Sequence, residues 1–548
     1  MKCVALLIRI HLMNNYRRIL LLLPFILACT ELPQDNKEDD TPPEPPVIEE
    51  PVEVHFKGSD GQALSSLTIP SSGEPVTVTL ESTGRWYLQT SSSWLQATPD
   101  SGKEGNMEIS ISSDKPYIQD NERIATLEAV PFGGKGESVT LSVSQEAFVK
   151  ANMFTIPPDP AYTLPRGGSA QVSFHSDEAW TLQSTVPWLK ITPDSGSAGD
   201  FVLQFTTEEN KYSNDRIAII RSTTPSGTKE DYILQHANVF ARRHIRTANV
   251  QNDFVVRYSS GISLSEIIIL IPYPETNEYQ DITNSQFSGA ELKTSDTGVN
   301  YLMCHNTSGF PKSGEAFISH SYTVDYYTLN TDFSKITERN LPYDTESPQY
   351  KRYTDICYGI NGDDKSFIMI DPTDPRIVAW ADQLWEEAKG DRIDYARICH
   401  KWVADNIEYG IYDGDNTIDE IIQRMSGDCG NMHSLWMSLL RCKGIPARPI
   451  VMAAPQNQWN DEIESHVRGE FYIPGYGWIP LDINNLQNGE NNFGKFPDQN
   501  FIVMNRDFSI DVKAGYKTYN CSLLQVVWWL VWCGGHGDLD GEVIFKEE

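Results

Sequence analysis

The sequence has little positive charge. It holds 44 Lys and Arg against 75 Asp and Glu, a formal net charge of −31 over 548 residues, and no stretch in which basic residues cluster. Proteins that bind nucleic acid neutralise backbone phosphates with clustered Lys and Arg side chains. Nucleic acid is therefore excluded from the expected partners. The length instead predicts a chain of three or four globular domains.

Long apolar runs are missing too. The run ILLLLPFILA (19–28) is too short to span a bilayer, which takes about 20 residues. The stretch 521–545 holds only about eleven apolar residues in its apolar run, also too few to span a bilayer, and is interpreted as two buried strands around GGHGDLDG. Its residues Trp528, Trp529 and Trp532 could also line a substrate cleft.

Cysteine pairs form no pattern. The chain has nine cysteines without a CxxC pair or a regular spacing, and seven remain when Cys3 and Cys29 are set aside. An odd number predicts at least one free thiol and argues against a disulfide scaffold.

The N-terminus has the features of an export signal. Arg17 and Arg18 precede the apolar run, and the segment Ile26 to Cys29 resembles a bacterial lipobox, in which the cysteine is acylated. An ordinary signal peptide is the alternative, and Met13 is an alternative start. Residues 1–28 are predicted to be a lipoprotein signal peptide, with Cys29 as the lipidation site.

An acidic and Pro-rich linker is predicted at 29–52. Its acidic cluster resembles signals that carry lipoproteins to the outer surface. The expected location is the bacterial outer membrane, with the protein held by its lipid and facing the cell exterior.

Two stretches of the chain copy each other. RWYLQTSSSWLQATPDSGKEGN (85–106) and AWTLQSTVPWLKITPDSGSAGD (179–200) place Trp86 and Trp180 94 residues apart. Short runs with alternating apolar and polar residues and Gly, Ser or Pro between them are typical of small β-sandwiches. Two such sandwiches are predicted.

The repeated W-L-x-x-T-P-D-S-G motif resembles the BACON module, an immunoglobulin-like domain of bacterial surface proteins. BACON-like domains are assigned to 53–148 and 149–240. The resemblance implies binding of glycan or mucin, and a role as spacer is the alternative. Recurring tryptophans favour core positions over sugar-stacking platforms.

A further β-rich domain is predicted at 241–350 from strand-like segments such as SEIIILIPYP. It resembles the β-domain that often precedes bacterial transglutaminase-like cores.

Helical spacing begins near residue 375 and includes a helix over 429–443. Cys429 then lies in the first turn, where free N–H groups and the helix dipole favour a thiolate. The alternative is a buried inert thiol, as expected for Cys399 and Cys442.

A thiolate nucleophile needs a base and a group that orients the base. The segment 465–485 is interpreted as a hairpin that brings His466 close to Asp482. His433, one turn after Cys429, is a competing base.

The motifs GDCG, LLRCKGIPAR and GYGWIPLD with the intervening histidine resemble the transglutaminase-like superfamily over about 375–485. The resemblance implies an α+β papain-like fold, with Cys429 as nucleophile, His466 as base and acid, and Asp482 as its orienting residue. Arg468 and Ile483 depart from the family pattern, in which an aromatic residue and a proline stand there.

Three further site candidates are weaker. Gln423 could be an oxyanion donor, Tyr409 could line the site or pack in the core, and Trp478 could contact substrate. The zinc-bearing members of the superfamily have CxxC pairs that this chain lacks. No metal and no cofactor are predicted.

The predicted architecture is multidomain: two immunoglobulin-like β-sandwiches, a further β-domain and an α+β transglutaminase-like domain at 351–548. The predicted function is acyl transfer or hydrolysis at peptide or carboxamide bonds of a protein or glycoprotein substrate. A non-catalytic glycan- or peptide-binding lipoprotein with a vestigial catalytic fold is the alternative.

Overall fold

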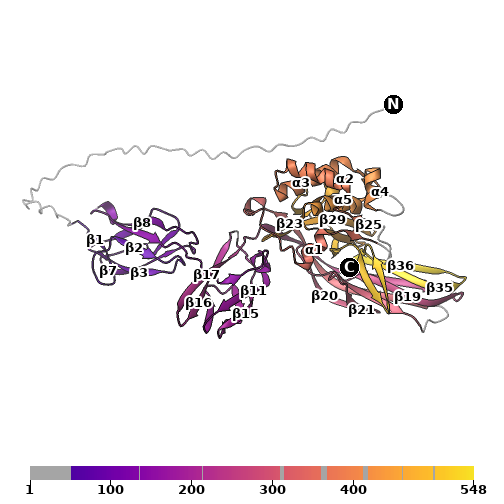
Figure 1. Ribbon diagram of the computed structural model, residues 1–548, viewed down its shortest axis with the longest axis horizontal. Coiled ribbons are helices and arrows are strands. Elements are labelled where there is room, and N and C mark those ends of the chain that lie inside the picture. Colours follow the sequence, from indigo (N-terminus) through magenta and orange to yellow (C-terminus); the bar gives the residue numbers. More distant parts are fainter. Residues whose placement is uncertain are drawn as a thin grey trace, which may run out of the picture.

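The computed structural model describes residues 51–134, 136–212, 214–308, 314–359, 367–411, 417–458, 461–497 and 500–547. The predicted signal peptide, Cys29 and the linker up to residue 50 lie outside them. The described residues form two β-sandwiches, a β-domain and a mixed head, as the predicted fold class has it (Figure 1). Within this described part, every helix is too short or too polar to cross a membrane.

The two sandwiches repeat one design. Trp86 and Trp180 are 1% and 2% exposed, so both fill the core between the sheets, as expected. The glycine of each TPDSG motif packs on the ring: a Cβ at Gly102 would lie 2.4 Å from Trp86, and one at Gly196 would lie 2.7 Å from Trp180. The recurring motif is therefore a packing unit.

The second tryptophan of each repeat lies nearer the surface. Arg123 lies over the ring of Trp94 and Arg216 over that of Trp188, each at 4.2 Å. Both arginines also donate to a glutamine at the end of their sandwich, Gln145 or Gln235. A stacked arginine occupies one ring face, which limits either ring as a platform for sugar.

The strands of the sandwiches have these bounds. The first contains β1 (Val54–Lys57), β2 (Ser66–Ile69), β3 (Val76–Ser82), β4 (Trp86–Thr90), β5 (Leu95–Thr98), β6 (Ser101–Gly102), β7 (Gly105–Ser113), β8 (Arg123–Pro131) and β9 (Val139–Gln145). The second contains β10 (Phe154–Thr155), β11 (Gly168–Ser176), β12 (Trp180–Ser184), β13 (Leu189–Thr192), β14 (Ser195–Gly196), β15 (Gly199–Thr207), β16 (Arg216–Thr224) and β17 (Gly227–Gln235).

Replacing Trp86 or Trp180 by alanine is expected to lower the free energy of unfolding of its own sandwich by about 3–5 kcal/mol, because a fully buried indole leaves a large cavity. Urea unfolding of the full chain measures the effect. Trp94→Ala and Trp188→Ala are the matched controls, with smaller losses expected at these half-buried positions. Equal losses at all four positions would contradict the distinction between core and surface rings.

The β-domain is built from two separate parts of the chain, which corrects the predicted boundaries. Its sheets have the orders β20-β23-β18-β36 and β21-β22-β19-β35. Strands β35 and β36 come from the C-terminal residues that the sequence analysis assigned to the catalytic domain. Figure 1 shows these yellow strands beside β19.

The β-domain strands have these bounds: β18 (Phe240–Tyr258), β19 (Ile262–Pro272), β20 (Gln280–Ser288), β21 (Glu291–Thr294), β22 (Asn300–Asn306), β23 (Gly314–Thr331), β35 (Trp528–Gly535) and β36 (Leu539–Glu547). Trp529 packs on Phe254 with ring centroids 5.5 Å apart, and Trp528 and Trp532 pack around Tyr519. Trp529 therefore packs within the β-domain, and Trp528 and Trp532 pack between that domain and residues 510–521.

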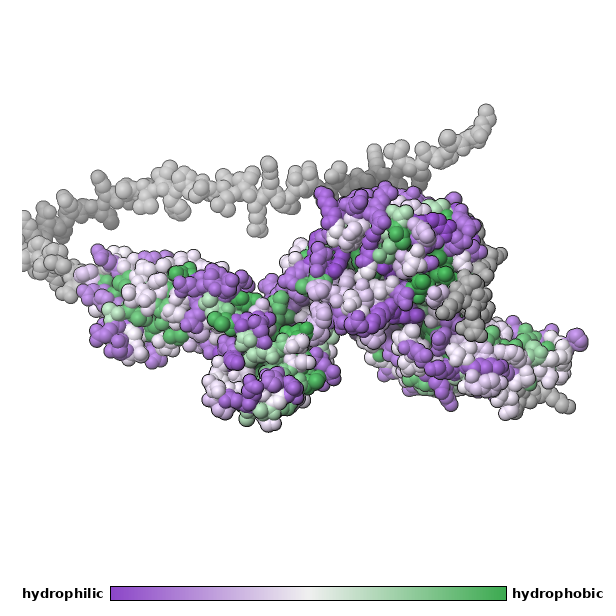
Figure 2. Space-filling model, viewed as in Figure 1, coloured by the Kyte–Doolittle hydropathy of each residue, from purple (hydrophilic) through white to green (hydrophobic). Residues whose placement is uncertain are grey.

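The head has a sheet of order β30-β29-β28-β32 with helices packed on it. Helix α5 lies at the centre of its core, because 11 of its 14 residues are buried and it contacts α2, α3, α4 and β29. Figure 1 shows α2 to α5 gathered at the side of the head away from the β-domain. In Figure 2, hydrophilic residues dominate the visible face of the head.

The helices of the head are α1 (Pro348–Thr354), α2 (Pro375–Glu387), α3 (Arg392–Asn406), α4 (Ile418–Arg424), α5 (Cys429–Cys442) and α6 (Ile483–Gln487). Its strands are β24 (Cys357–Tyr358), β25 (Ile368–Ile370), β26 (Glu408–Tyr409), β27 (Ser426–Gly427), β28 (Ala447–Ala454), β29 (Glu464–Ile473), β30 (Gly477–Leu481), β31 (Lys495–Phe496), β32 (Ile502–Asn505), β33 (Ile510–Ala514) and β34 (Lys517–Cys521).

Candidate active site

Cys429 is the first residue of α5. The Asp428 side chain accepts from the N–H of Asn431 at 3.0 Å, and Asn431 Oδ1 accepts from the N–H of Asp428 at 3.1 Å. This capping box fixes the start of the helix at Cys429. The N–H groups of a helix's first turn have no acceptor within the helix, so the thiol lies beside donors and the positive end of the dipole.

His466 and Asp482 come from the predicted hairpin of β29 and β30. His466 Nε2 lies 2.9 Å from Asp482 Oδ2, and the His466 ring also hydrogen-bonds the Cys429 side chain. Because Nε2 faces the carboxylate, Nδ1 is the ring nitrogen left for the thiol. The structure thus brings Cys429, His466 and Asp482 together, in the order thiol, imidazole, carboxylate.

Arg468 is a fourth member of this cluster, and the sequence analysis did not place it there. Its Nε donates to Asp482 Oδ2 at 2.7 Å, and its side chain is 4% exposed. The cross-strand register pairs Gly469 with Leu481, so Arg468, one residue further, is at the position opposite Asp482. His466 lies two residues earlier on the same face of β29. The H-x-R spacing was the available signal.

The neighbouring charges set the protonation of the pair. Burial alone would lower the pKa of His466, but the hydrogen bonds to Asp482 and Cys429 outweigh burial and raise that pKa to about 9. Burial alone would raise the pKa of Asp482, but the hydrogen bond from His466 and the Arg468 guanidinium hold the pKa of this carboxyl well below its usual range. An imidazolium and a carboxylate are therefore the forms at neutral pH.

His433 is a structural residue and not the base. Its Nδ1 donates to the carbonyl oxygen of Cys429 at 2.7 Å, and its Nε2 accepts from the N–H of Ile483 at 3.3 Å. Both ring nitrogens are thus occupied by backbone groups. Burial lowers the pKa of His433 to about 4, which keeps the ring neutral. It joins the start of α5 to the residue after Asp482.

Two cavities meet at the cluster. One, of about 380 Å³, includes Cys429 in its lining, and the other, of about 600 Å³, includes His466. Tyr409 and Ser465 line both. Tyr409 is 50% exposed, so it lines the site and does not pack in the core. Its position follows from the pairing of β26 with β27, which ends two residues before Cys429.

Two predicted site residues lie elsewhere. Gln423 is exposed on α4, where its amide donates to Asp419 at 2.6 Å, and it lines neither cavity. Trp478 lies under the Arg448 guanidinium at 3.8 Å and borders a different cavity with Tyr472. Neither residue is placed to act at the cluster, so both predicted roles are wrong. Gln423 bonds a neighbour in its own helix, and Trp478 packs against Arg448 beside a separate cavity.

Gln525 is a further residue that the sequence analysis missed. It lines the Cys429 cavity, and its amide donates to the carbonyl oxygens of Met452 and His466, both at 3.3 Å. It therefore ties the segment before β35 to the strand that carries the histidine. No motif around Gln525 signals this long-range contact.

The remaining thiols differ from Cys429 in their surroundings. Seven free cysteines lie in the described part of the chain. Burial raises the pKa of Cys399 and also that of Cys442, at the far end of α5, as expected for thiols within packed helices. Across the same described residues, no group of three or more His, Cys, Asp or Glu side chains is arranged to hold a metal ion.

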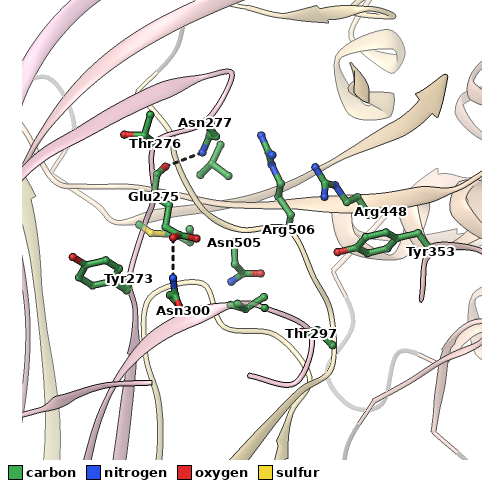
Figure 3. Close-up of a pocket in the computed structure, with 14 residues that line it drawn as sticks. Tyr273, Glu275, Thr276, Asn277, Thr297, Asn300, Tyr353, Arg448, Asn505 and Arg506 are labelled. Carbon is green, nitrogen blue, oxygen red and sulfur yellow. Dashed lines mark hydrogen bonds between the residues drawn. The ribbon is translucent and has the colours of Figure 1, made fainter. Parts of the chain in front are cut away.

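A third cavity, of about 210 Å³, lies where the head meets the β-domain. Figure 3 shows Arg448 and Tyr353 on one side of it and Tyr273, Glu275 and Asn300 on the other. The charges here are paired: Arg448 donates to the buried Glu470 at 2.6 Å, and Arg506 donates to Glu278. This cavity therefore belongs to the junction between domains.

Comparison with protein families agrees with this architecture. Residues 378–483 match the model of the transglutaminase-like superfamily, and residues 63–147 and 154–238 each match the model of the viral BACON domain. The chain therefore carries two BACON domains followed by a transglutaminase-like domain, which confirms the resemblance to both families. The matched head segment includes Cys429, His466 and Asp482.

Individual relatives are distant. An uncharacterized protein of Haemophilus influenzae is 23% identical over 284 residues, 45% of this chain and 72% of that protein. Among solved structures, a candidate cysteine protease of Cytophaga hutchinsonii aligns with 56% of this chain and 93% of its own, at 15% identity and a TM-score of 0.34. A GH5 xyloglucanase of Bacteroides ovatus aligns with 19% of this chain and 21% of its own, at 20% identity and a TM-score of 0.15.

Proposed function

We propose that this protein is a cysteine enzyme that cleaves or transfers acyl groups at peptide or carboxamide bonds of protein or glycoprotein substrates, with hydrolysis as its main reaction. The observation that carries the proposal is the hydrogen-bonded series of Cys429, His466 and Asp482 at the wall between two cavities. The transglutaminase-like match over the same residues supports it.

The reaction has two steps, acylation of Cys429 and hydrolysis of the resulting thioester. The Cys429 sulfur bonds to the substrate carbonyl carbon, the amide C–N bond breaks, and the His466 imidazolium gives its proton to the departing nitrogen. The neutral imidazole then takes a proton from water, the water oxygen bonds to the acyl carbon, and the C–S bond breaks. An amine in place of water would complete a transfer. The Cys429 N–H is the oxyanion donor.

The proposal extends to the location of the enzyme. Acylation of Cys29 would hold the protein on the bacterial outer membrane, with the linker and the two BACON domains between the lipid and the head. The domains would bind glycan or mucin, or act as spacers. Their arginine-covered surface tryptophans favour the spacer role. Retention of the full chain on a mucin or glycan array would support binding.

Iodoacetamide labelling of the full chain across pH tests the enzyme. Cys429 is expected to react faster at pH 6–8 than Cys533, an exposed thiol of β35, because the His466 ring hydrogen-bonds its side chain and the N–H groups at the start of α5 lie beside its sulfur. His466 has a raised pKa in the folded state, so it keeps its proton until the pH passes about 9. The advantage of Cys429 should therefore be present below pH 9 and be lost above it. Mass spectrometry of the labelled peptides measures both rates.

His466→Ala is expected to remove the advantage of Cys429 and leave Cys533 unchanged. Equal labelling of the two thiols, unaffected by His466→Ala, would contradict the enzyme and favour a binding protein with a vestigial fold. Assays that follow ammonia, new peptide termini and amine incorporation on a glycoprotein mixture then separate deamidation, peptide cleavage and transfer.

A further inference from the structure

The two cavities at the cluster differ in chemistry. The cavity of Cys429 exposes more apolar than polar surface: Phe367, Met369, Ile411, Val467, Phe508 and Leu523 line it, together with polar residues that include Asp428, Asn431 and Gln525. The cavity of His466 is lined mainly by polar side chains: Glu464, Arg468, Asn484, Asn485, Gln487 and Asn488. Because Tyr409 and Ser465 line both, the cavities are adjacent, one at the thiol and the other at the imidazole, and together they are called the cleft.

The reaction gives this cleft a direction, which rests on the proposed function. The imidazolium must donate to the departing nitrogen, so the amine part of the substrate lies on the side of His466. The acyl part then lies on the side of Cys429. The apolar cavity therefore receives the acyl side of the scissile bond, and the polar cavity receives the amine side.

Two residues that line the polar cavity, Arg468 and Asn484, each carry a buried atom without a partner among the described residues. Arg468 Nη1 is a donor and Asn484 Oδ1 is an acceptor, and neither has a hydrogen bond within the described part of the chain. The amide nitrogen of Asn484, Nδ2, lies 3.5 Å from the Met432 sulfur. The Nε of Arg468 donates to Asp482. Buried polar atoms left unpaired are unfavourable, so a ligand that satisfies both would gain affinity.

The charged groups that line this cavity are of both signs, so either an acidic or a basic side chain would meet a like charge. A carboxylate on the substrate would meet Glu464, and an ammonium would meet Arg468 and the His466 imidazolium. A hydroxyl or a primary carboxamide both donates and accepts, and so matches one free donor and one free acceptor.

We propose that the cleft selects peptides with an apolar residue on the acyl side of the scissile bond and Ser, Thr, Asn or Gln on the amine side, with Arg468 and Asn484 as the residues that recognise the polar side chain.

Competition among synthetic peptides tests this specificity. The set varies the acyl-side residue (Leu, Asp, Lys) and the amine-side residue (Asn, Leu, Asp, Lys), and kcat/KM is measured for each with the full chain. Leu before Asn should be preferred over Leu before Leu by about tenfold, the effect of one well-made hydrogen bond in a buried site.

Two variants locate the effect. Asn484→Asp should raise KM for amine-side Asn and shift the preference toward amine-side Lys, because the new carboxylate lies in the cavity. Ile411→Glu, at a position 79% exposed and therefore tolerant of charge, should shift the acyl-side preference from Leu toward Lys. Gln423→Ala, exposed and outside both cavities, is the matched control and should keep the wild-type pattern.

The outcomes separate the two proposals. Turnover with no amine-side preference, or with the pattern of wild type retained in Asn484→Asp, overturns the specificity and leaves the enzyme intact. Absence of turnover for every peptide, together with equal labelling of Cys429 and Cys533, overturns both.

Discussion

Replacing Cys429 by serine is expected to reduce turnover by about 10⁴-fold or more, the largest effect of any single change in this chain. The hydroxyl keeps the size and the hydrogen bond of the thiol. It is a much weaker nucleophile than the sulfur, so attack on the substrate carbonyl carbon is lost. The N-cap of α5 is made by Asp428 and Asn431 and is unaffected, so the fold should be retained.

Release of new termini from the preferred peptide measures the loss, and circular dichroism checks the fold. Cys442→Ser is the matched control, because this thiol lies at the other end of the same helix and outside both cavities. Intact-protein mass spectrometry should find an acyl adduct on wild type and Cys442→Ser but not on Cys429→Ser. Activity of Cys429→Ser close to that of the control would assign the chemistry to another residue.

Asp482→Asn is expected to lower kcat by about 10⁴-fold, because an amide cannot hold the imidazolium or fix the tautomer of His466. The variant should also lose about 3–5 kcal/mol of stability, since Arg468 remains buried without its carboxylate partner. Asparagine is a good N-cap residue, so the start of α6 should persist. Urea unfolding and kcat together measure the two losses.

The double variant Asp482→Asn, Arg468→Met separates stability from catalysis. Removal of the unpaired guanidinium should restore part of the stability, while kcat should stay as low as in the single variant. Recovery of kcat in the double variant would show that the carboxylate only neutralises Arg468. Asp419→Asn, an exposed carboxylate on α4, is the control and should change neither quantity much.

Local patterns in the sequence predicted the parts of the fold that depend on neighbours along the chain. The tryptophan repeat predicted both sandwiches, and the helical spacing over 429–443 predicted α5 and its start at Cys429. The turn between β29 and β30 predicted that His466 would lie near Asp482, because a hairpin pairs residues with no long loop to close. These contacts carry most of the candidate site.

Contacts between distant segments were not predictable from the same signals. The apolar pattern of the C-terminal residues predicted strands, but it did not indicate that β35 would pair with β19 or β36 with β18. Gln423 was predicted to be an oxyanion donor from its spacing before Cys429 in the sequence. In the structure it is exposed on α4 and donates to Asp419. Arg468 looked like a departure from a family pattern because its partner, Asp482, lies on another strand.

The pairing of β18 with β36 has a consequence for synthesis of the chain. Each sandwich is continuous in sequence and can fold as soon as it has been made. The β-domain cannot be completed in this way, since β18 and β19 pair with β23 and β22 early but receive their second neighbours only when the last 20 or so residues have been made. The head is thus an insertion in the β-domain, and it is synthesised while one edge of β18 and one edge of β19 are still unpaired. Loss of the final strands would leave those edges exposed to pairing with other chains, so premature termination near the C-terminus should produce aggregates in place of a shorter soluble enzyme.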